Sequence, residues 1–124
     1  MRVFKTRPFA RFAEHERIDD AALCDAVRRA ESGAVDADLG GGVIKQRIAR
    51  KGQGKSGGFR SIVLFRKGDR AFFVYGFAKS GRDNIRTDEI KAFRKLADTM
   101  LRLDDRALSA AMANGTITEV ICDG

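Results

Sequence analysis

The residues best suited to chemistry are nine basic side chains between positions 44 and 70, a stretch in which Asp69 is the one acid. They are Lys45, Arg47, Arg50, Lys51, Lys55, Arg60, Arg66, Lys67 and Arg70. Residues 8–38 have the opposite balance, with eight acids against four arginines. A one-sided cationic segment favours a polyanion, because each phosphate that a cation neutralises releases counterions. The pattern predicts binding of RNA or DNA, and a basic face that serves only solubility is the alternative.

Two of these cations are expected on one strand. The segment 43–48, Val-Ile-Lys-Gln-Arg-Ile, favours a strand, and residues two apart on a strand face the same side. Residues 51–58 contain four glycines and two lysines, which predicts a flexible, exposed loop before the next strand. If the strands form a meander, cations from several strand ends converge into a shallow phosphate cradle. Those cations are Lys45, Arg47, Lys51, Lys55, Arg60, Lys79 and Arg82.

The N-terminal part predicts a short strand followed by a helical hairpin. Val3 to Thr6 favours a strand, and Pro8 permits a helical turn to begin directly after it. Asp19 or Asp20 can cap a second helix with an apolar stripe, which Gly33 ends.

The remaining apolar segments predict the centre of a sheet and two further helices. Residues 59–66 and 71–77 are nearly continuous apolar runs joined by a hairpin, which indicates strands covered on both faces. Thr87 is expected to cap a third helix, and Asp104 or Asp105 to begin a fourth. Residues 116–122 predict a last strand. The predicted fold is α+β in the order β-α-α-β-β-β-α-α-β, with helices packed on a mostly antiparallel sheet.

Length and composition predict one globular domain over residues 1–124. The chain has 124 residues, a net charge of +7, 44% hydrophobic and 33% charged residues, enough for a core without metals or disulfides. The longest apolar run, 71–78, is too short to cross a membrane, and Met1 to Lys5 lacks the apolar region of a secretory signal. A cytoplasmic location is therefore expected, with Cys24 and Cys122 as two buried thiols.

Two familiar chemistries are excluded by departures from their patterns. Gly54-Lys55-Ser56 has Ala49 where a nucleotide-binding loop needs its first glycine, and a strand follows it where that loop needs a helix. We therefore expect no nucleotide cofactor. The sequence has no Cys-x-x-Cys motif and no histidine cluster, so we also expect no metal. His15 is the single histidine and lies in the acidic part of the chain, which excludes a two-histidine nuclease and predicts a surface or inter-helix position.

Three segments together resemble toxins of the RelE/HigB type from bacterial toxin-antitoxin modules. They are Val43-Ile44-Lys45-Gln46-Arg47-Ile48, Lys55-Ser56-Gly57-Gly58-Phe59-Arg60 and Phe77-Ala78-Lys79-Ser80-Gly81-Arg82-Asp83-Asn84-Ile85. The resemblance spans roughly residues 1–103 and implies a small RelE-like fold, to which residues 104–124 add a C-terminal extension. It also implies a toxin that cleaves mRNA in the ribosomal A site and is neutralised by a cognate antitoxin.

The resemblance also suggests roles for single residues. Lys45 and Arg47 match the paired bases of the family, Arg60 the arginine that opens the next strand, and Arg82 a later arginine beside Lys79. Ile85 stands about where some members have a catalytic tyrosine.

Cleavage of RNA without a metal requires attack of a 2′-hydroxyl on the adjacent phosphate. We assign proton transfer to Lys45, because crowding by other cations favours its neutral amine, and stabilisation of the phosphorane to Arg60 and Arg82. The residues expected to bind RNA are Arg47, which orients the backbone, and Arg50, Lys51, Lys55 and Lys79. The alternative for each cation is a phosphate anchor with no catalytic part. Such a set should act slowly on free RNA, and a ribosome that aligns the 2′-hydroxyl supplies the missing orientation.

Two other functions remain open at this point. A non-nucleolytic toxin of the same superfamily would inhibit DNA gyrase, as the ParE group does. A general RNA-binding module would need exposed aromatic rings for stacking, and Phe59 and Phe77 are the candidates at the rim of the sheet. For the toxin, we expect the antitoxin to cover the basic sheet with an acidic or amphipathic segment.

Overall fold

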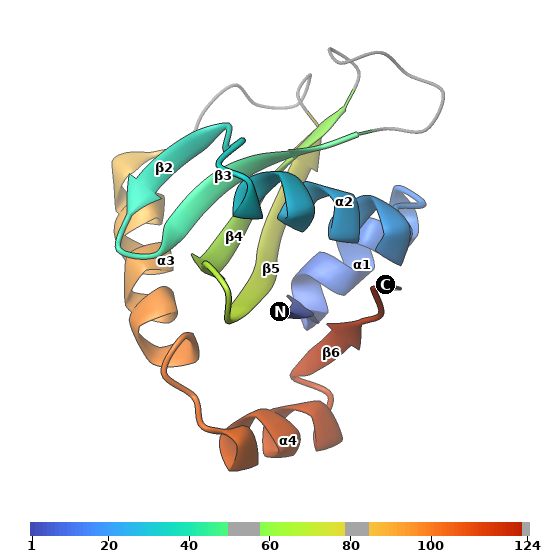
Figure 1. The fold of residues 1–124 in the computed structure, drawn as a ribbon, viewed down its shortest axis with the longest axis vertical. Coiled ribbons are helices and arrows are strands. Elements are labelled where there is room, and N and C mark those ends of the chain that lie inside the picture. Colours follow the sequence, from blue (N-terminus) through green and yellow to red (C-terminus); the bar gives the residue numbers. More distant parts are fainter. Residues whose placement is uncertain (50–57, 79–84, 123–124) are drawn as a thin grey trace.

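A computed structural model describes residues 1–49, 58–78 and 85–122 (Figure 1). In chain order its elements are β1 (Arg2–Thr6), α1 (Arg7–His15), α2 (Asp20–Glu31), β2 (Ala37–Gly40), β3 (Val43–Ile48), β4 (Phe59–Arg66), β5 (Arg70–Ala78), α3 (Thr87–Met100), α4 (Asp105–Ala113) and β6 (Ile117–Val120). The strands form one sheet in the order β2-β3-β4-β5-β1-β6. Every neighbouring pair is antiparallel except β1 and β5, so the predicted mostly antiparallel α+β fold is confirmed.

The first two helices cover one face of the sheet (Figure 1). Pro8 lies in the first turn of α1, where its missing N–H costs no helical hydrogen bond. The predicted cap of α2 is confirmed, because the Asp19 carboxylate accepts a hydrogen bond from the Ala22 N–H at 3.0 Å. Phe9 and Leu23 are fully buried in the core that these helices form with the sheet.

The third helix covers the opposite face. Its residues Ala97 and Met100 pack with Ile62, Leu64 and Phe72 of the central strands in a second core. Both faces of β4 and β5 are therefore buried, as their continuous apolar sequences predict. Thr87 is not the cap: it is the first residue of α3, and the cap is Arg86, whose N–H donates to the Glu89 carboxylate at 2.9 Å.

One strand was not predicted. β2 has only four residues, at the edge of the sheet beside β3, and its register shifts between Asp38 and Gly40. A short, irregular edge strand rich in Asp and Gly carries too little apolar alternation to be recognised. The turn after it requires glycine at position 42, where φ is +83° and a Cβ would lie 2.7 Å from the Leu101 side chain.

The C-terminal segment returns to the N-terminal half of the chain. β6 pairs with β1, and the Ile121 N–H donates to the Asp20 carboxylate at 3.0 Å. This pairing places Cys122 beside Cys24, and the two form a disulfide with a Cα–Cα distance of 5.6 Å. The expectation of two separate buried thiols is therefore wrong. The 98-residue separation gave no sign of the pairing, because β6 and α2 meet only through the complete sheet. Within the described ranges, no helix is long and apolar enough to cross a membrane.

Candidate nucleic-acid interface

Strands β3 and β4 place three of the predicted cations on one face of the sheet. Arg47 lies opposite Arg60 in the register, and Lys45 lies opposite Ile62. Ile62 belongs to the core beneath α3, whereas Ile44 and Ile48, which alternate with the two β3 cations, belong to the core beneath α1 and α2. Because side chains alternate along a strand, Lys45, Arg47 and Arg60 share the α3 face. We call these three residues the cation cluster.

An acid that the sequence analysis overlooked lies within this cluster. Asp36, which precedes β2, places its Oδ2 3.3 Å from the Nε of Arg60 and 3.8 Å from the Nζ of Lys45. The sequence neighbours of Lys45 suggested that only cations surround it. The contact with Asp36 shows that this is wrong. Asp36 belongs to the acidic N-terminal segment, and only the pairing of β2 with β3 brings it next to a basic strand. The acidic and basic segments, which are separate in the sequence, therefore contact each other here in the folded protein.

The Arg60 side chain is mostly buried, and one of its nitrogens has no hydrogen-bond partner among the described residues. Its side chain is 15% exposed, and its Nε pairs with Asp36. Its Nη1 is buried and finds no hydrogen-bond partner among the described residues. A buried donor without a partner costs about 1–3 kcal/mol, so an anionic oxygen that reached this nitrogen would gain a hydrogen bond that the described residues leave unmade. Guanidinium groups bind phosphate oxygens with two parallel hydrogen bonds, which suits this position.

A buried amide beneath the cluster fixes the position of Asp36. Gln46 is 1% exposed, and its Oε1 accepts a hydrogen bond from the Asp36 N–H at 3.1 Å. Its Nε2 donates to the backbone oxygens of Ala26 at 2.8 Å and Ala34 at 3.0 Å. A buried amide whose groups are all paired holds its partners rigidly. Gln46 therefore ties α2, the segment before β2 and β3 together directly behind the cation cluster.

Other sequence predictions have mixed outcomes. Arg50, Lys51, Lys55, Lys79 and Arg82 lie outside the described residues, as does most of the predicted 51–58 loop. Arg66 and Arg70 lie at the other end of β4 and β5, so the nine basic residues do not form one patch. His15 is exposed, as predicted, with 84% of its side chain accessible. Ile85 is buried in the core beneath α3.

The predicted stacking rings are not available at the rim. Phe59 is 2% exposed and Phe77 is 7% exposed, and they belong to the two opposite cores. Phe59 packs edge-on against Phe12 of α1, with ring centroids 5.7 Å apart. The expectation that these rings lie at the rim is wrong, because the helices on both faces extend to this end of the strands.

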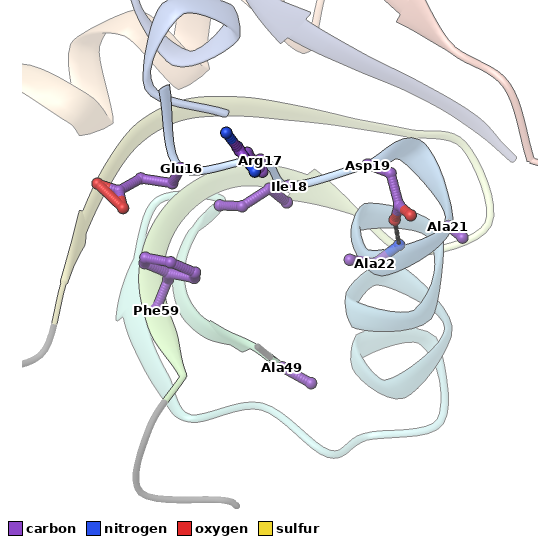
Figure 2. Close-up of a pocket in the computed structure, with 8 residues that line it drawn as sticks. All are labelled: Glu16, Arg17, Ile18, Asp19, Ala21, Ala22, Ala49 and Phe59. Atoms are coloured by element: carbon purple, nitrogen blue, oxygen red, sulfur yellow. Dashed lines mark hydrogen bonds between the residues drawn. The ribbon is translucent and has the colours of Figure 1, made fainter. Parts of the chain in front are cut away.

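A cavity of about 610 Å³ lies on the other face of the sheet (Figure 2). It is bordered by the α1–α2 connection, the first turn of α2 and the facing ends of β3 and β4, with lining residues Glu16, Arg17, Ile18, Asp19, Ala21, Ala22, Ala49 and Phe59. Ile18, Ala22 and Phe59 belong to the core beneath α1 and α2, so the cavity is separated by the sheet from Lys45 and Arg60. Its charged groups are two acids and one arginine, which does not favour a phosphate. The cation cluster is therefore the better anion site.

Comparison with known proteins agrees with this arrangement. No curated protein matches the chain. The family model described as the RelE toxin of the RelE/RelB toxin-antitoxin system matches residues 1–120, which is nearly the whole chain and includes every strand of the sheet and the complete cation cluster. The chain therefore belongs to the RelE toxin family, that is, to toxins that act in a toxin-antitoxin system and have a cognate antitoxin as partner.

Proposed function

We propose that this toxin is a ribosome-dependent endoribonuclease that inhibits translation by cleaving mRNA in the cytoplasm. Family membership supports a toxin. The observation that carries the step to RNA is Arg60, whose buried Nη1 lacks a partner among the described residues while Lys45 and Arg47 lie on the same face. This is the arrangement that a phosphate of the message requires, because two strands hold the cations in fixed positions before the ligand arrives.

Each cation has a part in the proposed reaction. Arg60 stabilises the negative charge on the phosphorane, Lys45 transfers a proton, and Arg47 orients the RNA backbone. Arg82 supplies further positive charge, on the strength of its match to the family pattern. The additional RNA contacts are assigned to Arg50, Lys51, Lys55 and Lys79. The reaction uses no metal and no cofactor.

The ribosome supplies what this set of residues lacks. In-line attack requires the 2′-hydroxyl, the phosphorus and the leaving oxygen to be collinear, and fixed orientation of this kind accelerates reactions by many orders of magnitude. We expect slow cleavage of free RNA and fast cleavage of message bound in the ribosome. The antitoxin neutralises the toxin by covering the cation cluster with an acidic or amphipathic segment, since such a segment pairs with the cations that bind RNA.

Expression from a tightly controlled promoter, followed by ribosome profiling, tests the proposal. The toxin should stop protein synthesis before DNA replication, and message ends should accumulate within ribosome-protected fragments. Lys45→Ala and Arg60→Ala should abolish growth arrest. Arg66→Ala is the matched control, because it removes a basic residue of the same strand from the opposite end. Unchanged toxicity of both variants would remove the mechanism, and replication arrest before translation arrest would favour gyrase inhibition.

A further inference from the structure

Asp36 is the one acidic group that contacts the cation cluster within the described part of the chain. We propose that Asp36 is the general base that removes the proton from the attacking 2′-hydroxyl. This inference rests on the proposed function. It assigns removal of the 2′-hydroxyl proton to Asp36 and donation of a proton to the leaving oxygen to Lys45.

The ion pairs decide which group accepts a proton. Lys45 Nζ lies 3.8 Å from the Asp36 carboxylate, and an ammonium paired with a carboxylate has no free electron pair for a proton. Arg60 and Arg47 are guanidinium groups, which stay protonated in proteins. The Asp36 carboxylate is therefore the acceptor at this site. Lys45 is then the proton donor, which replaces the neutral amine that its basic sequence neighbours predicted.

The position of Asp36 suits catalysis better than a purely structural role. Its side chain is 31% exposed, so a ligand can reach part of it, and the contacts to Arg60 and Lys45 both use Oδ2. Its backbone is fixed by the hydrogen bond to buried Gln46. A base must stand within hydrogen-bond distance of the proton that it removes, and a rigid support of this kind provides that precision.

The proposed step balances as follows. Asp36 takes the proton of the 2′-hydroxyl, and the electron pair of that oxygen forms a bond to phosphorus. Arg60 donates from Nη1, the nitrogen that Asp36 does not contact, to the non-bridging oxygens of the phosphorane, where charge develops. The bond from phosphorus to O5′ breaks, its electron pair stays on O5′, and Lys45 donates a proton there. The products are a 2′,3′-cyclic phosphate and a free 5′-hydroxyl.

The first test compares Asp36→Asn with Asp69→Asn in single-turnover cleavage of message on programmed ribosomes at saturating toxin. Asp69 is a matched control, because its carboxylate also pairs with two basic residues, at the opposite end of β4. D36N should lower the rate of the chemical step by about 10²–10⁴-fold, the usual contribution of a general base. D69N should leave it unchanged. D36N should bind the programmed ribosome at least as well as the unmodified toxin, because it removes a negative charge from a phosphate site.

The second test separates the base from the acid. In a message with sulfur in place of the scissile O5′, the leaving group needs no proton, so loss of a general acid should have little effect. We expect Lys45→Ala to recover most of its rate on this substrate and D36N to stay slow. Recovery by D36N would assign Asp36 to the leaving group and overturn the proposal.

Other outcomes are equally decisive. A D36N rate close to that of the unmodified toxin, or a loss of ribosome binding that accounts for the whole loss of rate, overturns the role of base while the proposed function stands. If D36N does not fold, Asp36→Glu replaces it: this variant keeps the carboxylate but displaces it by one methylene, so a folded D36E with an unchanged rate also overturns the role. If the unmodified toxin does not cleave message on the ribosome, the proposed function fails and the role of Asp36 fails with it.

Discussion

At each end of β4 one aspartate pairs with two basic residues, but the two clusters differ in their other contacts. At one end Asp36 pairs with Arg60 at 3.3 Å and Lys45 at 3.8 Å. At the other, Asp69 pairs with Arg66 at 3.1 Å and Arg70 at 3.2 Å. Arg60 and Arg70 have nearly equal exposure, 15% and 13% of the side chain. Composition and burial alone would assign the two clusters the same role.

The hydrogen bonds distinguish them. Arg70 Nη1 donates to the backbone oxygen of Leu103 at 2.6 Å and ties the hairpin to the end of α3. The Asp69 carbonyl also accepts the N–H of Arg2 at 3.0 Å, so this end is closed by contacts within the fold. Arg60 Nη1 has no such contact within residues 1–49, 58–78 and 85–122. Each arginine has one buried nitrogen without a hydrogen-bond partner among the described residues, Nη1 of Arg60 and Nε of Arg70. Arg70 Nε still lies 3.2 Å from the Asp69 carboxylate, whereas no contact within the described ranges is made by Arg60 Nη1.

The largest expected effect is on cleavage. Arg60→Ala should lower the single-turnover rate on programmed ribosomes by about 10²–10³-fold, because it removes a fixed donor to the developing phosphorane. Arg70→Ala, which removes an equally buried arginine from the same sheet, should cleave at nearly the rate of the unmodified toxin once folded. Equal losses in the two variants would show that both ends serve the fold alone.

For the free energy of unfolding we expect the reverse: Arg70→Ala should have the larger effect and Arg60→Ala the smaller. Arg70→Ala leaves the Leu103 carbonyl without its donor and should lower the free energy of unfolding by about 1–3 kcal/mol. Arg60→Ala should cost less, because the contact that Arg60 makes among the described residues is an ion pair with the partly exposed Asp36 carboxylate and not a hydrogen bond to a backbone carbonyl. Urea denaturation of both variants, followed by circular dichroism, measures the difference. An Arg60→Ala variant that is the less stable of the two would contradict the comparison.

The sequence predicts the cations of this site but not their counter-ion. Lys45 and Arg47 could be placed on one face because residues two apart on a strand share a side, whereas the approach of Arg60 depended on the strands forming a meander. Asp36 could not be placed, because its contact depends on a four-residue edge strand and on a buried Gln46, neither of which has a local signature. The disulfide escaped for the same reason, since α2 and the chain end meet only after β6 joins the sheet.

A smaller effect is expected on the salt dependence of binding. Each phosphate contact on single-stranded RNA contributes about 0.7 to the slope of log affinity against log salt concentration. Lys45→Ala should therefore reduce that slope by about 0.7 when binding to programmed ribosomes is measured across a salt series. Arg66→Ala should leave it unchanged, because Arg66 lies at the closed end of β4. A slope that falls equally in both variants would mean that RNA contacts both ends.

The smallest effect is expected for an exposed ion pair that lies outside both clusters of β4, the pair of Arg2 and Glu119. Arg2 Nε contacts the Glu119 carboxylate at 2.9 Å, with 42% and 34% of the two side chains exposed. The hydrogen bond from Arg2 lowers the pKa of Glu119 below its usual 4.5. A lowered pKa means that the pair stabilises the fold at pH above 4.5 and that this contribution is lost as the pH falls through the lowered value.

Glu119→Gln should therefore lower the free energy of unfolding by at most about 1 kcal/mol at neutral pH, the usual limit for an exposed pair. The difference between the variant and the unmodified toxin should vanish in acid, which urea denaturation at a series of pH values measures. The loss of stability in this variant is a reference for the variants at the two ends of β4, because Arg2 and Glu119 form a single ion pair that is partly exposed to water. If Arg70→Ala costs no more than Glu119→Gln, then the Leu103 hydrogen bond adds nothing to a surface ion pair. The hydrogen bonds would then not distinguish the Asp69 cluster from the Asp36 cluster in their contribution to stability.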